Sequence, residues 1–182
     1  MHDDPRLAPV DPPYAPEVQA AFDVLMRGQP PLLLFRTMAH NPRVLQRMIA
    51  GGLLDKGSIS LRARELMILR TCARCGAEYE WGVHIQAFGA RCGWTAEQMR
   101  STVHGDARDA CWSDEERIVL RLADELRATA TVDDALWSEA AAMFGPPQLV
   151  ELLALAGLYG AVSILVNALR IAHEPSAPRF PA

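Results

Sequence analysis

Two carboxylates and one imidazole, Glu65, Glu80 and His84, are the residues of this sequence best suited to acid–base chemistry. Glu80 and His84 are four residues apart, so on a helix their side chains share one face and can touch. Glu65 lies on an earlier predicted helix, which ends at Gly76 because glycine commonly follows the last helical residue. A carboxylate beside an imidazole commonly moves protons near neutral pH. The spacing therefore predicts a proton-transfer site, although a surface ion pair would show the same spacing.

Length and composition indicate one soluble globular domain. The chain has 182 residues, half of them hydrophobic and 22% charged, which is enough to bury one sizeable core. Its net charge of −4 leaves no basic footprint for nucleic acid. The acidic, polar opening Met1–Arg6 is unlike a secretion leader, and the four cysteines are expected to be reduced thiols. We therefore expect a cytoplasmic protein that does not bind nucleic acid.

Helix start and stop signals predict an all-α protein of about eight helices, because no segment shows the alternation of a strand. The expected helices span residues 17–27, 30–39, 43–50, 61–75 and 78–91, followed by one that begins at the Ser113–Glu116 capping box, one from Thr131 to Phe144 and one from Pro146 to Ile171. We divide the chain into an N-terminal arm with five prolines (residues 1–16), a helical domain (17–173) and a C-terminal tail (174–182). The arm either wraps a neighbouring subunit or lies loose on the surface.

The uncharged segment Leu152–Leu169 is long enough to suggest a membrane span. However, Ser163 and Asn167 interrupt it, and Arg170 is the only cation near it, so no basic flank sets a topology. A helix that is apolar all round can equally be the central helix of an oligomer. We therefore expect a buried central helix and no membrane.

Two other chemistries fit the motif less well. No second histidine accompanies His84 at ligand spacing, so a metal site is not predicted. The pair Cys72-Ala-Arg-Cys75 has the spacing of a redox dithiol. Both cysteines fall at the C-terminal end of their predicted helix, where the helix dipole disfavours a thiolate. Structural cysteines are favoured, and a redox pair stays an alternative.

The same residues resemble the carboxymuconolactone decarboxylase family, which also includes the alkylhydroperoxidase-D-like proteins. The resemblance lies in Arg64-Glu-Leu-Met-Ile-Leu-Arg70, in Cys75-Gly-Ala-Glu-Tyr-Glu-Trp-Gly-Val-His84 and in Gly93-Trp-Thr. Flanking segments extend it over most of residues 32–171. The resemblance implies an all-helical fold that assembles as trimers or hexamers, with active sites between helices near subunit interfaces.

The spacing also separates two branches of this family. Peroxidase members share a motif of a glutamate, then a C-x-x-C pair, then a histidine. Three residues separate the second cysteine from this histidine. Counting back from His84, those two cysteine positions hold Ala77 and Glu80. Cys72 and Cys75 lie five residues too early to replace them. The chain therefore looks like the decarboxylase-type branch, which retains the proton-transfer residues.

We hypothesise a cofactor-independent decarboxylase (carboxy-lyase) that acts on a small carboxylated lactone or keto acid. His84, held by Glu80, would act as the acid or electrostatic stabiliser, and Glu65 would orient it or relay the proton. The candidate substrate contacts are an arginine, first Arg64 or Arg70 and then Arg36, together with Trp81 and Tyr79, which would shape the pocket.

Three other functions stay open at this stage. A thiol-dependent peroxidase would use Cys72 and Cys75. An isomerase, dehydratase or cyclase would use the same acid–base residues on the same fold. A non-catalytic oligomer would bind its ligand near Trp81 without turnover.

Overall fold

All regular secondary structure in the part of the chain that the structure describes is helical. A computed structural model describes residues 4–182, which form nine helices and no strand. The helices are α1 (Pro16–Met26), α2 (Leu33–Met38), α3 (Pro42–Ala50), α4 (Leu61–Arg74), α5 (Glu78–Cys92), α6 (Ala96–His104), α7 (Asp114–Thr129), α8 (Asp134–Met143) and α9 (Pro146–Leu169). The predicted all-α class is confirmed, and the expected helices are present with ends shifted by a few residues. Helix α6, which begins at a capping box between Thr95 and Gln98, was not expected from the sequence.

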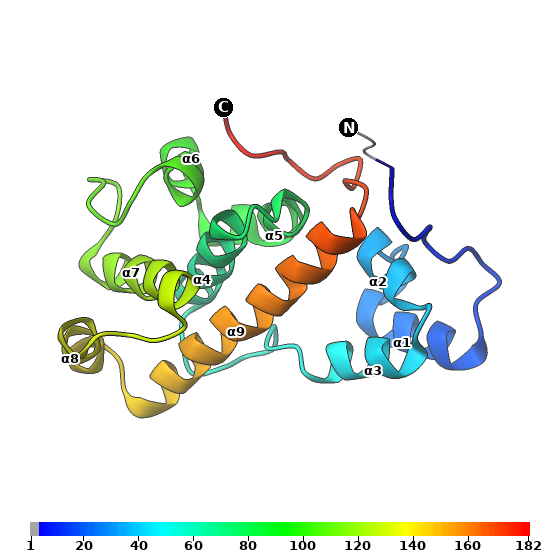
Figure 1. Cartoon of the computed structure of the whole chain (residues 1–182), viewed down its shortest axis with the longest axis horizontal. Helices are drawn as coiled ribbons and strands as arrows, with labels where there is room; N and C mark the ends of the chain where they lie inside the picture. The colour runs from blue at the N-terminus through cyan, green and yellow to red at the C-terminus, as the bar shows by residue number, and fades with distance from the viewer. Residues whose placement is uncertain (1–3) are drawn as a thin grey trace.

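Helix α4 is the centre of the fold (Figure 1). It packs against α5, α6, α7 and α9, and every residue from Ala63 to Cys72 is buried. Ser60 caps its first turn, because the Ser60 hydroxyl accepts a hydrogen bond from the backbone N–H of Ala63 at 3.0 Å. A helix enclosed in this way can keep a carboxylate only beside a partner. The burial of α4 therefore requires Glu65 to be paired inside the protein.

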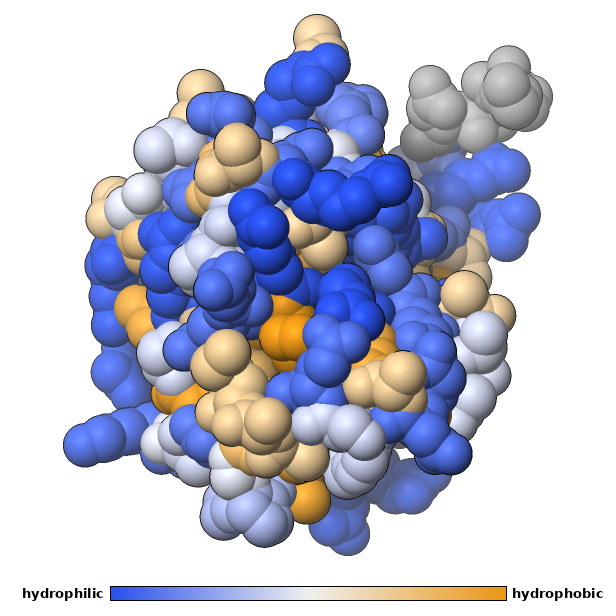
Figure 2. Space-filling model, turned by 90° about the vertical axis from the view of Figure 1, so that its left-hand side faces the viewer, coloured by the Kyte–Doolittle hydropathy of each residue, from blue (hydrophilic) through white to orange (hydrophobic). Residues whose placement is uncertain are grey.

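Helix α9 crosses α4 with one buried face and one exposed face (Figure 1). Leu155 and Tyr159 are buried, whereas Val150 is 67% and Ile164 is 66% exposed. By length and composition α9 could cross a membrane, and half of its most apolar window is buried in the fold. The side of the molecule that carries α7 and α8 is by contrast mainly hydrophilic, with apolar side chains in small separate areas (Figure 2). Helix α9 thus packs centrally and also presents an apolar outer face.

Helices α1, α2 and α3 pack on one another at the end of the molecule opposite α8 (Figure 1). The start of α2 is held by the rest of the chain. The backbone N–H of Leu34 donates to the Tyr79 hydroxyl at 3.1 Å, and that of Leu33 donates to the Glu174 carboxylate at 2.6 Å. The Tyr79 hydroxyl itself donates to Glu174 at 2.7 Å. Because the first amides of a helix have no acceptor within the helix, these contacts both cap and anchor α2.

The described part of the N-terminal arm lies on the chain's own helices. The backbone N–H of Arg6 donates to the carbonyl of Leu169 at 3.0 Å, and that of Val10 donates to the carbonyl of Arg36 at 3.2 Å. The Arg36 side chain donates back to the Val10 carbonyl and pairs with Asp11. Residues 6–11 are therefore fastened to α2 and to the end of α9, so this part of the arm is not loose, whereas contact with a neighbouring subunit stays a prediction.

The C-terminal tail lies along α5. Glu78 pairs with Arg179 at 2.8 Å and accepts the backbone N–H of Phe180 at 2.8 Å. The Phe180 ring packs edge-on to Trp81, with ring centroids 5.5 Å apart. Gly82 permits this approach, because a Cβ at that position would lie 2.3 Å from the carbonyl oxygen of Pro178.

Replacing Gly82 by alanine is expected to lower the melting temperature and to release the tail. The added Cβ would collide with the Pro178 carbonyl, which is backbone and cannot rotate away. Gly89→Ala is the matched control, because a Cβ at this other glycine of α5 meets only the Ile85 side chain, at an ordinary contact distance of 3.5 Å. There the better helix former should stabilise the protein by up to about 1 kcal/mol. Circular-dichroism melting and limited proteolysis of the tail measure both effects. A Gly82→Ala protein at least as stable as Gly89→Ala would contradict the tail's placement.

Candidate active site

The structure brings Glu65, Glu80 and His84 together in the interior. His84 Nδ1 lies 2.7 Å from Glu65 Oε2, and His84 Nε2 lies 3.4 Å from Glu80 Oε1. Glu65 is 0%, Glu80 7% and His84 4% exposed. The arrangement is therefore an imidazole held between two buried carboxylates and differs from an ion pair on the surface.

Two consecutive helices produce this geometry. Glu65 lies in the second turn of α4, and Glu80 and His84 lie in the first two turns of α5. Gly76, with φ of 64°, makes the left-handed turn between the helices, which glycine adopts without strain. The four-residue spacing then directs Glu80 and His84 to the same face of α5. The sequence suggested Glu80 as the residue that holds His84, but Glu65 makes the shorter contact.

Arg64 extends the arrangement on the side away from His84. Its guanidinium pairs with Glu65 Oε1 at 2.7 Å and donates to the carbonyl of Leu54 at 2.7 Å. It also lies over the Phe88 ring, 5.0 Å from the centroid. Arg64, Glu65, His84 and Glu80 thus form a chain of alternating charge, in which each buried charge has an opposite neighbour. The Arg64 side chain is used in holding Glu65 and does not line the large cavity described below.

The two carboxylates keep His84 protonated at neutral pH. Burial by itself lowers the pKa of an imidazole, but the hydrogen bonds with Glu65 and Glu80 outweigh burial and raise the pKa of His84 to about 9. Both ring nitrogens then carry a proton, so Nδ1–H donates to Glu65 and Nε2–H faces Glu80. Because the Nε2 contact is the longer one, its proton is the one that a ligand can take.

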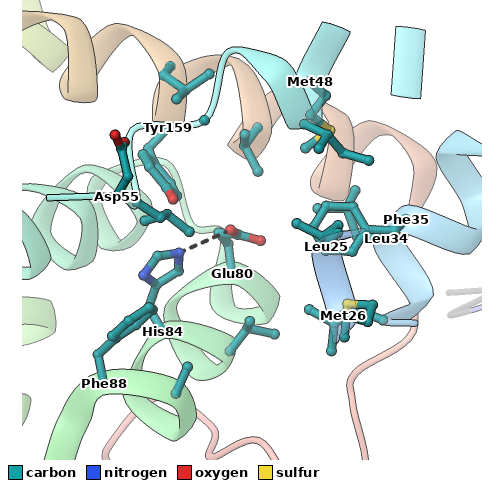
Figure 3. Close-up of a pocket in the computed structure, with 18 of the residues that line it drawn as sticks. Leu25, Met26, Leu34, Phe35, Met48, Asp55, Glu80, His84, Phe88 and Tyr159 are labelled. Carbon is teal, nitrogen blue, oxygen red and sulfur yellow. Dashed lines mark ion pairs between the residues drawn. The ribbon is translucent and has the colours of Figure 1, made fainter. Parts of the chain in front are cut away.

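A cavity of about 550 Å³ opens beside His84 and Glu80. Figure 3 shows His84, Glu80, Phe88 and Tyr159 on one side, from α5 and α9. The opposite side is apolar and comes from the N-terminal helices: Leu25, Met26, Leu34, Phe35 and Met48. The polar side chains of the lining are those of Asp55, Glu80, His84 and Tyr159. This volume and lining suit a small organic molecule.

Arg70, an expected substrate contact, does not line this cavity. Its fully buried guanidinium donates to the two oxygens of Asp124 at 2.6 and 2.8 Å. It also donates to the carbonyls of Ser101, Thr102 and Gly105 at 3.0–3.1 Å. The last carbonyls of a helix have no partner within the helix, so Arg70 caps α6. Its contacts are therefore structural.

The remaining expected contacts also lie outside the cavity lining. Trp81 Nε1–H donates to the Thr102 hydroxyl at 3.0 Å, which joins α5 to α6. The Tyr79 hydroxyl caps α2, and Arg36 holds the N-terminal arm. These residues support the walls of the cavity: Tyr79 positions Leu34, which does line it.

Tyr159 lines the cavity with a polar group and was not expected there from the sequence. Its ring meets the His84 ring edge-on, with centroids 4.9 Å apart, and Phe88 stacks on His84 at 5.6 Å. Burial, together with the charge of Glu80, raises the pKa of the Tyr159 hydroxyl well above its usual range, so the group stays protonated. The available signal was a lone phenol in an otherwise apolar helix, because a buried tyrosine hydroxyl usually has a partner.

The alternative chemistries find less support. Cys72 is fully buried, and burial together with the charge of Glu80 raises the pKa of its thiol well above the usual range. All four cysteines are free, and neither Cys72 nor Cys75 lines the cavity. A thiolate nucleophile is thus disfavoured at this position. Within residues 4–182, no group of three or more His, Cys, Asp and Glu side chains is arranged to hold a metal ion.

Comparison with family models confirms the resemblance stated from the sequence. Residues 42–125 match the model described as "Carboxymuconolactone decarboxylase family". This range contains Glu65, Glu80 and His84. No curated protein matches the chain.

Solved structures with the same fold carry other activities in their descriptions. An uncharacterized peroxidase-related protein from Silicibacter sp. TM1040 aligns with a TM-score of 0.79 and 17% identity, over 96% of this chain and 94% of that chain. The alkylhydroperoxidase AhpD core of a peroxidase-related protein from Ralstonia eutropha JMP134 gives 0.76 and 18%, over 96% and 95%. The debrominase Bmp8, in complex with 2,3,4-tribromopyrrole, gives 0.76 and 17%, over 93% and 91%. At such identities the likeness establishes the fold alone.

A titration of His84 should show a pKa near 9 in the folded protein, and Glu65→Gln should lower it because a neutral amide stabilises imidazolium less. The raised pKa also contributes stability that is complete below about pH 6.5, the value for a free imidazole, and that is lost as pH rises through about 9. Nuclear magnetic resonance of labelled histidine measures the pKa, and urea unfolding across this pH range measures the stability. Glu139→Gln, which removes a surface carboxylate paired with Arg121, is the control and should leave His84 unchanged. An ordinary imidazole pKa in the wild-type protein would refute this account of the Glu65–His84–Glu80 triad.

Proposed function

We propose, for a chain whose residues 42–125 belong to the carboxymuconolactone decarboxylase family, a cofactor-independent enzyme that transfers a proton to or from a carbon atom of its substrate. The observation that carries this proposal is the buried imidazolium of His84 between Glu65 and Glu80, at the wall of an apolar cavity. Within this class, decarboxylation of a small keto acid or carboxylated lactone is the reaction to test first.

Each member of the triad has a separate role in this proposal. Glu65, at 2.7 Å from Nδ1, fixes the ring and keeps it protonated. The Nε2–H group of His84 is the acid, because it faces the cavity side of the ring and has only a long contact to Glu80. Glu80 is the base that takes a proton from carbon or returns one to the ring. An acid and a base side by side suit a reaction that passes through an enolate.

For decarboxylation, the bond between the α-carbon and the carboxyl group breaks, and its electron pair moves into the adjacent carbonyl to form an enolate. The enolate oxygen accepts a hydrogen bond from His84 Nε2–H, which stabilises the developing charge. Carbon dioxide leaves, and a proton passes from His84 to the carbon, after which solvent restores the imidazolium. The apolar lining supports this step because a carboxylate loses its hydration there. Its charge moves onto the enolate oxygen beside His84 Nε2–H when neutral carbon dioxide leaves.

The same residues could instead serve an isomerase, a dehydratase or a cyclase, since each needs an acid and a base at one carbon framework. The relatives described as peroxidase-like and as a debrominase raise a thiol mechanism as the other candidate. That candidate is the weaker one here, because the pKa of the Cys72 thiol is raised by burial and Cys72 does not line the cavity.

Carbon dioxide release from a panel of β-keto acids and carboxylated lactones tests the proposal. We expect Glu80→Gln and His84→Ala each to lower turnover by at least about a hundredfold, the scale of a positioned acid or base. Gln86→Ala is the control, because Gln86 lies on the same helix but is exposed and bonds to Ser176. Full activity in both triad variants would sink the assignment, whereas no release from any substrate would transfer it to another proton-transfer reaction.

We further propose that the enzyme acts in the cytoplasm, away from the membrane, as a homotrimer or homohexamer. The support is the apolar outer face of α9, where Val150 and Ile164 are exposed on a helix that also packs in the fold. An obligate interface would cover such residues. Light scattering after size exclusion should give a wild-type oligomer and a smaller species for Ile164→Glu. A wild-type monomer would contradict the proposal.

A further inference from the structure

We propose that the Tyr159 hydroxyl and His84 Nε2–H together bind one oxygen atom of the substrate, and that the substrate is otherwise a mainly apolar, enolisable carbonyl compound with at most one carboxylate. This inference rests on the proposed function, because it identifies the substrate class and a further catalytic residue of the same site. Its test below uses ligand binding alone, so it can fail or succeed independently of any turnover assay.

The Tyr159 hydroxyl lacks a hydrogen-bond partner among the described residues. Within residues 4–182 this hydroxyl makes no hydrogen bond, whereas the Tyr79 hydroxyl makes two. No fully buried side-chain nitrogen or oxygen of these residues is without a partner. The hydroxyl must therefore reach open space, and the space beside it is the cavity. In Figure 3 it points toward the side where His84 and Glu80 lie.

The cavity offers few side-chain hydrogen-bond donors. Of its four polar side chains, Asp55 and Glu80 are carboxylates, which accept hydrogen bonds. His84 and Tyr159 are the two side-chain donors, and their rings are in contact at 4.9 Å. Tyr159 stays protonated because burial raises its pKa. Two donors side by side in an apolar-lined cavity form an arrangement that stabilises an oxyanion.

The lining of the cavity also limits the chemistry of the rest of the substrate. The wall opposite His84 is entirely apolar, and none of the lysines or arginines in residues 4–182 lines the cavity. A phosphate or a second carboxylate would therefore lack a cationic partner, and a polyol would leave several hydroxyls unpaired, each at a cost. A carbonyl compound with an apolar body fits both walls: its oxygen meets the donor pair and its body meets Leu25, Phe35 and Met48.

The test is the binding of 2-naphthol and of naphthalene to the purified full-length protein, measured by titration calorimetry. 2-Naphthol carries one acidic oxygen on an apolar body, as an enol does, and naphthalene is the same body without the oxygen. The wild-type protein should bind 2-naphthol at least about tenfold more tightly than naphthalene, because 2-naphthol can form two hydrogen bonds in the apolar-lined cavity. Absorbance spectra should show that the pKa of bound 2-naphthol is lower than in water.

Tyr159→Phe keeps the ring and its contact with His84 but removes the hydroxyl. It should reduce the preference for 2-naphthol by about five- to tenfold, raise the pKa of the bound naphthol and leave naphthalene binding unchanged. Tyr14→Phe is the matched control, because the Tyr14 ring packs edge-on to Phe22 and does not line this cavity, so the preference should not change. The proposal is overturned if Tyr159→Phe weakens both ligands equally, if it leaves the preference intact, or if the wild-type protein does not distinguish the two ligands or binds neither.

Discussion

The hydrogen bond between Glu65 and His84 is the interaction on which the arrangement of the site depends. It joins the central helix α4 to α5, and it is made where neither group can reach water. A carboxylate enclosed in this way is tolerable only with a cationic neighbour, and removing one partner of such a pair typically costs about 3–5 kcal/mol. Arg64 on one side and Glu80 on the other complete a sequence of four alternating charges. The local sum of charge is therefore zero, which allows two acids and two bases to be buried beside an apolar cavity.

Much of the fold and the centre of the site could be predicted from the sequence because they depend on local rules. Capping residues and glycines fixed the helix ends, and the four-residue spacing fixed the shared face of Glu80 and His84. Helix α6 was missed although Thr95 and Gln98 form the same type of capping box as the one recognised at Ser113. Few apolar residues mark it, because the side chains that it buries are polar: Gln98, Ser101 and Thr102.

The substrate contacts could not be obtained in the same way, because they depend on packing between distant segments. At about 100° per residue, Arg70 lies about 140° around α4 from Glu65, so an arginine there is directed toward other elements. It meets Asp124 and the end of α6 instead. The cavity, by contrast, combines α5 with α9 and with apolar residues from α1–α3. Tyr159 comes 75 positions after His84 (159 − 84), and no local pattern connects the two.

The capping of α2 has a consequence for the order in which the protein is completed during synthesis. Helix α2 leaves the ribosome first, but the Glu174 carboxylate that holds its first amide follows 141 residues later. Tyr79 is available sooner, yet its hydroxyl is itself oriented by Glu174. Since chains emerge from the N-terminus and pack as partners become available, the apolar wall opposite His84 is made early and secured late. A nascent chain that has already formed α4 and α5 would therefore possess its acid–base residues before the apolar wall of the cavity is held in place.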